Sequence, residues 1–216
     1  MLTPSSIEPD ARHYAVADRL QAEGQVVLPG FLPLELTAAL AALARAQWRA
    51  GAFRPAGVGR GADFALRPDI RKDQVHWVDA DTAPVLQRLW RQELEPLRYA
   101  INARTFLGLY DFEGHFSVYP PGAFYRRHVD RFQSAGQRTV SLVVYLNDVW
   151  QAADGGALRI YYRDETGAER YTDVLPEAGT LACFLSEATA HEVLPAQRER
   201  FSFTGWFRVR NPDRLA

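Results

Sequence analysis

The second half of the chain alternates short hydrophobic runs with turn-forming clusters. From Thr105 onward, runs rich in Val, Tyr, Phe and Thr are separated by Gly, Pro and Asp. β-Branched and aromatic side chains favour extended backbone, whereas Gly, Pro and Asp favour turns. Strands are predicted at residues 115–120, 124–130, 138–146, 157–163, 169–174, 180–185, 190–194 and 200–209. Because no helical segment intervenes, these strands predict a sandwich or jelly roll.

The first third of the chain has a helical pattern instead. Apolar residues near helical spacing predict helices at 11–23, 33–50 and 82–102, with Pro96 kinking the last, and a short strand at 25–30. We therefore expect a single domain over residues 1–216. Helices before about residue 104 would support a β-core over about 105–210.

Composition indicates an ordinary globular protein. The 216 residues are 47% hydrophobic and 24% charged, with a formal net charge of −1. This charge provides no overall basic field for nucleic acid, and no apolar run reaches the roughly 20 residues that a membrane span requires. The N-terminus shows no basic segment followed by an apolar one, as a secretory signal would. We expect a cytoplasmic protein that binds neither nucleic acid nor membranes; the sequence does not indicate its oligomeric state.

Two potential metal ligands lie two residues apart in a predicted strand. His128 and Asp130 flank Val129, and residues i and i+2 of a strand point to the same face. His191, at the start of another predicted strand, is the candidate third ligand. Two histidines and one carboxylate form the ligand set of non-haem iron(II) oxygenases, although zinc remains chemically possible.

The other histidines, His13, His76 and His115, lack such neighbours. A structural role is the ordinary interpretation of a single histidine.

A fixed arginine follows His191 by nine residues. Alternation places Arg200, Ser202, Thr204 and Trp206 on one face of a predicted strand and the phenylalanines on the other. The planar guanidinium of Arg200 suits a carboxylate ligand, and a surface ion pair is the alternative. On a second predicted strand, Ser141 and Tyr145 share a face with Thr139 and Val143, so the Tyr145 hydroxyl can reach the same anion.

Together these segments resemble the catalytic half of the prolyl 4-hydroxylases. The resemblance is greatest to the branch that contains the animal oxygen-sensing hydroxylases of hypoxia-inducible factor and their bacterial relatives. It covers about residues 57–210 and includes residues 69–78. The segments that carry it are Tyr119-Pro120-Pro121-Gly122, His128-Val129-Asp130, Tyr145-Leu146-Asn147, Gly155-Gly156-Ala157-Leu158-Arg159-Ile160, and His191-Glu192-Val193-Leu194-Pro195 with Arg200.

The resemblance implies a double-stranded β-helix, the jelly-roll core that cupins share, and assigns roles to the candidate residues. The implied iron(II) ligands are His128, Asp130 and His191. Arg200 is the implied anchor of the 2-oxoglutarate C5 carboxylate; the implied supporting or pocket-lining residues are Tyr145, Thr204, Tyr119 and Trp206. Oxygen is the implied second co-substrate, with ascorbate as a supporting reductant.

Three functions remain open on the sequence. The resemblance favours prolyl 4-hydroxylation of a cytosolic protein, and the bacterial relatives point to elongation factor Tu. The alternatives are a 2-oxoglutarate oxygenase that hydroxylates a free amino acid or another small molecule, and a non-enzymatic jelly-roll module whose metal triad is vestigial or sensory. A glycine-rich lid over residues 54–69 would favour a protein substrate.

Overall fold

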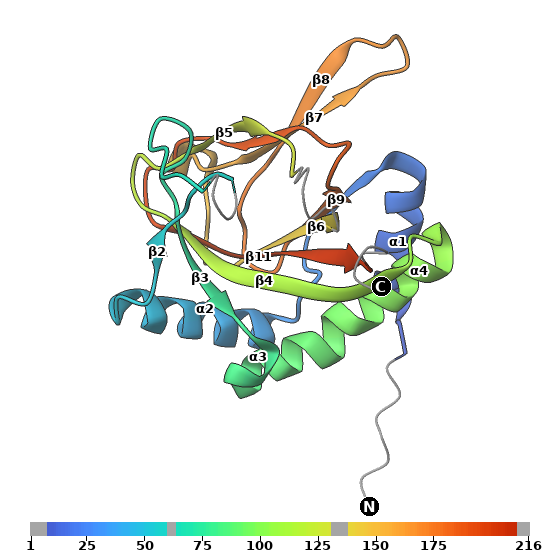
Figure 1. Cartoon of the computed structure of the whole chain (residues 1–216), viewed down its shortest axis with the longest axis horizontal. Helices are drawn as coiled ribbons and strands as arrows, with labels where there is room; N and C mark the ends of the chain where they lie inside the picture. Colours follow the sequence, from blue (N-terminus) through green and yellow to red (C-terminus); the bar gives the residue numbers. More distant parts are fainter. Residues whose placement is uncertain (1–7, 60–63, 131–137, 211–216) are drawn as a thin grey trace, which may run out of the picture.

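Two antiparallel sheets form the core of the protein (Figure 1). The computed structural model describes residues 8–59, 64–130 and 138–210. The larger sheet runs in the order β1 (Gln25–Leu28), β9 (Leu181–Leu185), β6 (Arg138–Tyr145), β11 (Arg200–Val209), β4 (Leu109–Tyr119), β3 (Gln74–Val78), β2 (Arg54–Pro55). The smaller runs β5 (Tyr125–His128), β10 (His191–Val193), β7 (Leu158–Arg163), β8 (Glu169–Val174). The predicted mostly-β, jelly-roll architecture is confirmed.

Helices cover the face of the larger sheet that points away from the smaller one (Figure 1). The helical elements are α1 (Ala11–Glu23), α2 (Leu34–Arg49), the 3-10 turn η2 (Ala80–Thr82), α3 (Pro84–Leu89), the π-helical turn η3 (Trp90–Leu94), α4 (Glu95–Thr105) and the 3-10 turn η4 (Ala152–Asp154). Three strands from the first 104 residues, β1, β2 and β3, extend the larger sheet. Among the described residues, no helix combines the length and apolarity needed to cross a bilayer.

Alternation along β11 separates the two sides of the larger sheet, as predicted. Phe201, Phe203 and Phe207 belong to the core beneath the helices. Arg200 and Trp206 instead line a cavity between the two sheets. The sheet thus has one face that stabilises the fold and one that carries polar groups.

The predicted helix 82–102 is divided by a π-helical turn. η3 ends where the Glu95 N–H donates to the Trp90 carbonyl, five residues back, and Pro96 occupies the first turn of α4. Proline has no N–H and its ring crowds the carbonyl four residues earlier. The wider π-helical turn before Pro96 accommodates the proline ring. At the position of the expected kink, the helix therefore changes from π-helical to α-helical.

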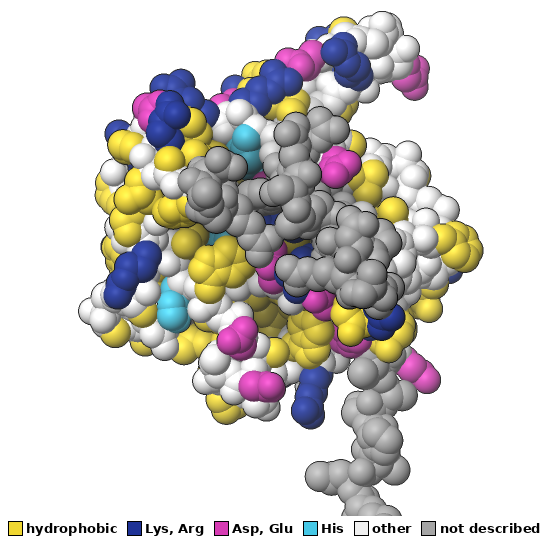
Figure 2. Space-filling view, viewed as in Figure 1, with side chains coloured by type: hydrophobic (Ala, Val, Ile, Leu, Met, Phe, Trp, Pro, Cys, Tyr) yellow, Lys and Arg dark blue, Asp and Glu magenta, His cyan; other side chains and the backbone are white. Residues whose placement is uncertain are grey.

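The smaller sheet extends into the β7–β8 hairpin, which projects from the molecule (Figure 1). A turn at 164–167 joins the two strands: the Gly167 N–H donates to the Asp164 carbonyl and Gly167 has φ +80°. On the face shown in Figure 2, basic and acidic side chains intermingle along this hairpin. An ion pair between β7 and β8 joins Arg159 and Asp173 at 2.8 Å.

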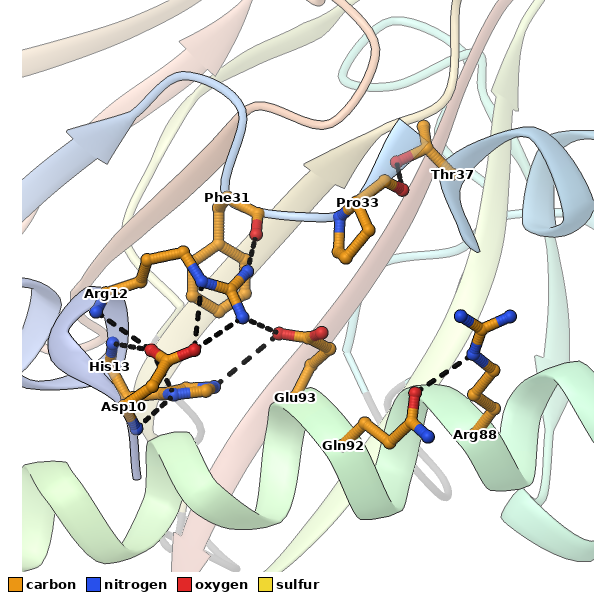
Figure 3. A network of polar contacts seen from close by, with 9 residues as sticks. All are labelled: Asp10, Arg12, His13, Phe31, Pro33, Thr37, Arg88, Gln92 and Glu93. Carbon is orange, nitrogen blue, oxygen red and sulfur yellow. Dashed lines mark hydrogen bonds and ion pairs between the residues drawn. The ribbon is translucent and has the colours of Figure 1, made fainter. Parts of the chain in front are cut away.

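A buried polar network ties α1 to η3 (Figure 3). Asp10 caps α1, and its N–H donates to His13 Nδ1 at 3.1 Å. His13 and Glu93 are only 2% and 3% exposed. Glu93 Oε2 lies 3.4 Å from an Arg12 nitrogen and 3.5 Å from His13 Nε2. Arg12 also donates to the Phe31 carbonyl, so this network joins α1, η3 and the loop after β1.

We expect His13→Ala to lower the free energy of unfolding by about 2–4 kcal/mol, because it leaves a cavity, removes a capping contact and takes a neighbour from a buried carboxylate. Urea denaturation measures the change. Arg19→Ala is the control on the same helix, since the Arg19–Glu23 pair is about half exposed and should contribute less than about 1 kcal/mol. Equal effects of the two substitutions would contradict a structural role for the network.

Candidate metal centre and anion pocket

Two neighbouring strands bring the three predicted ligands together. His128 at the end of β5 lies opposite His191 at the start of β10, and Asp130 follows β5 by two residues. One potential ligand atom from each of the three lies within 4.8 Å of the others. His128 Nε2 is 3.6 Å from Asp130 Oδ1, and His191 Nε2 is 3.9 Å from Asp130 Oδ2.

Main-chain carbonyls orient both imidazoles. His128 Nδ1 lies 2.7 Å from the Arg126 carbonyl and His191 Nδ1 lies 3.0 Å from the Thr189 carbonyl. A carbonyl oxygen only accepts hydrogen bonds, so each Nδ1 must carry the proton. The lone pair is then on Nε2, the nitrogen that faces Asp130. This arrangement is typical of metal-binding histidines.

Two donors from the larger sheet hold Asp130. Its Oδ2 accepts hydrogen bonds from Ser141 Oγ at 2.7 Å and from Trp206 Nε1 at 2.9 Å. Burial by itself raises the pKa of Asp130, but His191, His128 and Trp206 outweigh burial and hold this pKa well below its usual value. The carboxylate is therefore charged at neutral pH and able to bind a cation.

Burial lowers the pKa of His191 to about 4, so its imidazole is neutral at pH 7. Two imidazoles and one carboxylate fit iron(II), and they do not exclude zinc.

Arg200 is a buried cation next to this cluster, in the same cavity of about 920 Å³. It is 1% exposed, and its Nε donates to the Gly156 carbonyl at 2.7 Å. Within the part of the chain that the structure describes, no acidic side chain forms an ion pair with it. A buried charge without a counterion costs several kcal/mol, so this pocket is suited to an anion. The alternative interpretation, a surface ion pair, does not fit its burial.

Two tyrosines complete the anion pocket. The guanidinium carbon of Arg200 lies 4.9 Å from the Tyr119 ring centre and 5.0 Å from that of Tyr145. The buried Tyr145 hydroxyl has no hydrogen-bond partner among the described residues. Burial raises the pKa of Tyr145 to about 12, so the hydroxyl keeps its proton. It is a donor that a bound carboxylate would satisfy.

Gly156 lets the Arg200 side chain approach the main chain. A Cβ on Gly156 would lie 3.0 Å from Arg200 Cδ, and Gly156 has φ +66°. Both the close contact and the left-handed backbone favour glycine here. The Gly155-Gly156 pair thus positions the arginine as well as leading into β7.

The predicted residues do converge on one cavity. Its walls include His128, Asp130, His191, Arg200, Tyr119, Thr204 and Trp206. Tyr145 lies against Arg200 in the adjoining core cluster. Trp206 also donates to Asp130, a contact that the sequence did not predict.

Other cavity residues were missed. His115 was expected to be structural, yet it is on the cavity wall, 5.5 Å from the Trp206 ring. The alternation His115, Ser117, Tyr119 along β4 was the available signal, because Tyr119 was already a predicted pocket residue.

An Arg–Tyr stack supports His128 from β5. The Tyr125 ring stacks on His128 at 3.6 Å, and the Arg71 guanidinium lies 4.1 Å from the Tyr125 ring centre. Arg71 forms a bidentate pair at 2.6–2.8 Å with Asp73, which is 1% exposed. No sequence pattern singled out these partners, since the loop before β3 brings them to β5 only in the fold.

The predicted lid at 54–69 is described only in part, because residues 60–63 lie outside the described residues. Val58 and Ala65 form a β-bridge on either side of them. Phe64 and Trp77 line the cavity and are 55% and 51% exposed, respectively, so aromatic surface borders its opening.

Comparisons with known proteins agree with this geometry. Residues 114–208 match the model of the 2OG-Fe(II) oxygenase superfamily. A Pseudomonas putida prolyl-4-hydroxylase structure is 47% identical, with a TM-score of 0.81 over 92% of this chain and 99% of the other. A Trichoplax adhaerens prolyl hydroxylase, solved with a peptide of hypoxia inducible factor, has the same fold: TM-score 0.79 at 24% identity, covering 91% and 88% of the chains.

Curated animal proteins match about two thirds of the chain. The mouse Egl nine homolog 1 is 32% identical over 152 residues, which is 64% of this chain and 35% of that protein. The chain thus spans about a third of this relative's length. This chain belongs to the 2OG-Fe(II) oxygenase superfamily and, within it, to the prolyl hydroxylase family.

Proposed function

We propose that this protein is an iron(II)- and 2-oxoglutarate-dependent prolyl 4-hydroxylase that acts on a cytosolic protein. The observation that carries the proposal is the buried Arg200, without an acidic partner among the described residues, in one cavity with His128, Asp130 and His191. Together these residues can bind a metal ion and a carboxylate co-substrate in the same cavity. The 47% identity to the Pseudomonas putida prolyl-4-hydroxylase supports the reaction type.

In this proposal His128 and His191 bind iron(II) through Nε2, and Asp130 binds it through a carboxylate oxygen. When bound, iron(II) with 2-oxoglutarate and oxygen supplies oxidative decarboxylation to succinate and carbon dioxide, coupled to insertion of one oxygen atom into a substrate C–H bond. The protein holds the ligands in place through the Arg126 and Thr189 carbonyls and through Ser141. Ascorbate would support turnover as a reductant.

Arg200 pairs with the C5 carboxylate of 2-oxoglutarate in this proposal. Tyr145 donates its free hydroxyl to the same carboxylate, and Thr204 and Tyr119 line the pocket around it. Trp206 lines the pocket and keeps Asp130 in place. Fixed donors in a buried pocket bind a carboxylate more strongly than the same groups in water.

We expect Gly156→Ala to raise the 2-oxoglutarate concentration needed for half-maximal turnover, because the new methyl group displaces Arg200. The control is Gly167→Ala in the hairpin turn, where φ is +80° and no atom lies within 4 Å of the added Cβ. Both variants should lose about 1–2 kcal/mol of stability to the left-handed backbone. Only Gly156→Ala should change the 2-oxoglutarate requirement, by about tenfold. A change of equal size in Gly167→Ala would contradict the positioning role of Gly156.

The shape of the cavity supports a protein substrate. Phe64 and Trp77 leave aromatic surface exposed at its edge, which a chain longer than one residue can cover. The proposed substrate presents a target proline, and elongation factor Tu is the first candidate. An oxygenase of free amino acids is the competing function.

Succinate formation separates the two functions. Iron(II)-loaded protein is incubated with 2-oxoglutarate and oxygen, together with free L-proline, proline-containing peptides or elongation factor Tu. Stimulation by a peptide or protein, and none by free proline, is the expected result. Stimulation by free proline alone would favour the small-molecule function, and no succinate in any tube would contradict both.

A further inference from the structure

A second buried serine lies behind the donor to Asp130. Ser186 follows β9, is 0% exposed, and its Oγ is 2.8 Å from Ser141 Oγ. Its own N–H donates to the Thr139 carbonyl at 3.0 Å, which fixes its backbone against β6. Ser141 in turn is 1% exposed and lies directly opposite Trp206 in the β6–β11 register.

Proton counting sets the direction of this chain of hydrogen bonds. Ser141 Oγ donates to Asp130 Oδ2 at 2.7 Å, and this bond uses its single hydroxyl proton. Ser141 then has no proton for Ser186, so Ser186 must be the donor in the bond between them. The sequence Ser186 to Ser141 to Asp130 is therefore one directed relay. A hydroxyl that accepts a hydrogen bond becomes a stronger donor in its own bond.

This relay acts on one carboxylate oxygen. Oδ2 accepts from Ser141 and from Trp206, whereas Asp130 Oδ1 is the oxygen nearer to His128 Nε2, at 3.6 Å. Two donors on Oδ2 fix the rotation of the carboxylate and leave Oδ1 available. Groups that orient a metal ligand commonly change metal affinity by about tenfold to a hundredfold.

We infer that Ser186 is a positioning residue of the metal centre, acting on Asp130 only through Ser141. The inference rests on the proposed function, because it takes Asp130 as a metal ligand. Among the hydrogen bonds that the structure describes, the Ser186 hydroxyl bonds Ser141, and the Ser186 N–H bonds the Thr139 carbonyl. Ser186 therefore has no described hydrogen bond to a proposed metal ligand or to a proposed co-substrate residue. A purely structural serine would affect folding and leave metal affinity unchanged.

The test measures Mn(II) affinity of the full-length protein, from the free Mn(II) signal in electron paramagnetic resonance. We expect Ser141→Ala to weaken binding about tenfold to a hundredfold and Ser186→Ala about threefold to tenfold, the effect of one hydrogen bond. Ser117→Ala is the matched control, because Ser117 is a buried cavity serine that bonds His115 at 3.1 Å instead. Ser186→Thr keeps the hydroxyl and should retain wild-type affinity.

A double-mutant cycle distinguishes a relay from two independent effects. If Ser186 acts only through Ser141, the Ser141→Ala/Ser186→Ala double variant binds Mn(II) as weakly as Ser141→Ala and no more weakly. Multiplicative losses would overturn the relay. If Ser141→Ala fails to fold, the test uses Ser186→Ala and Ser186→Cys instead. Wild-type Mn(II) affinity in both of these variants would overturn the relay.

The same Mn(II) titration distinguishes a failure of the proposed ligand set from a failure of the relay. Asp130→Ala should lose Mn(II) binding. Wild-type affinity in that variant would contradict the proposed ligand set. Binding that is lost in Asp130→Ala but unchanged in Ser186→Ala would overturn the relay alone and leave the proposed function standing.

Discussion

Asp130→Ala is expected to abolish 2-oxoglutarate turnover and to weaken metal binding by more than about a hundredfold, because even groups behind a ligand contribute up to that factor. Two imidazoles alone would remain as ligands, without the negative charge of the Asp130 carboxylate. The hydroxyl of Ser141 and the indole of Trp206 would lose their shared acceptor, at a cost of about 1–3 kcal/mol in stability. Succinate formation and Mn(II) titration measure the two effects.

The control for this variant is Asp173→Ala, which removes a carboxylate that pairs with Arg159 on the smaller sheet. It should leave turnover and metal affinity unchanged. Circular dichroism of both variants shows whether the fold is retained. Near-normal succinate formation by folded Asp130→Ala would contradict the assignment of Asp130 as a ligand.

The second large effect is expected in Arg200→Lys. Lysine keeps the positive charge but has no planar fork and no Nε to donate to the Gly156 carbonyl. Losing one charge-assisted hydrogen bond costs about 1.5–3 kcal/mol, which corresponds to a rise of roughly 10- to 150-fold in the 2-oxoglutarate requirement. Metal affinity should change little, because Arg200 is not among the proposed ligands.

Arg198→Lys provides the matched control two residues away. Arg198 is 45% exposed and pairs with Asp154 at 3.2 Å, so its replacement should leave the 2-oxoglutarate requirement unchanged. Half-maximal 2-oxoglutarate concentrations of the wild type and both variants are compared at saturating iron(II). An unchanged requirement in Arg200→Lys would show that another group anchors the carboxylate.

Local sequence patterns predicted much of the fold and the convergence of the site. Period-2 alternation correctly placed Arg200 and Trp206 on one face of β11 and the phenylalanines on the other. This success has a simple cause, because side-chain direction in a strand depends only on residue parity. His128 and Asp130 also lie close together as expected, but β5 ends at His128, so strand parity does not explain the position of Asp130.

Contacts that depend on how strands pair could not be predicted in the same way. Ser141 was correctly placed on the face of Tyr145, but its bond to Asp130 requires the β6–β11 register and the path of the chain after β5. The Arg71–Asp73 pair reaches Tyr125 because Arg71 forms a β-bridge with Tyr125, a pairing that the sequence did not indicate. The π-helical turn before Pro96 was not predicted either, because helical periodicity with a proline indicates a kink but not the type of helical turn.

The sequence also did not predict that Arg200 is buried. Alternation predicted its face, but burial depends on Gly156, Tyr119 and Tyr145 from three other parts of the chain. The structure thus strengthens the interpretation of Arg200 as an anion anchor for a reason that the sequence did not contain: burial without an acidic partner among the described residues.

The most direct test of the proposed activity is mass spectrometry of elongation factor Tu and other proline-bearing proteins. The enzyme is loaded with iron(II) and 2-oxoglutarate without oxygen and then exposed to oxygen. The account predicts the gain of one oxygen atom on a proline, dependent on 2-oxoglutarate and lost with His128→Ala. Succinate formation without oxygen gain on any protein proline would contradict prolyl hydroxylation, and the absence of both products would contradict an active oxygenase.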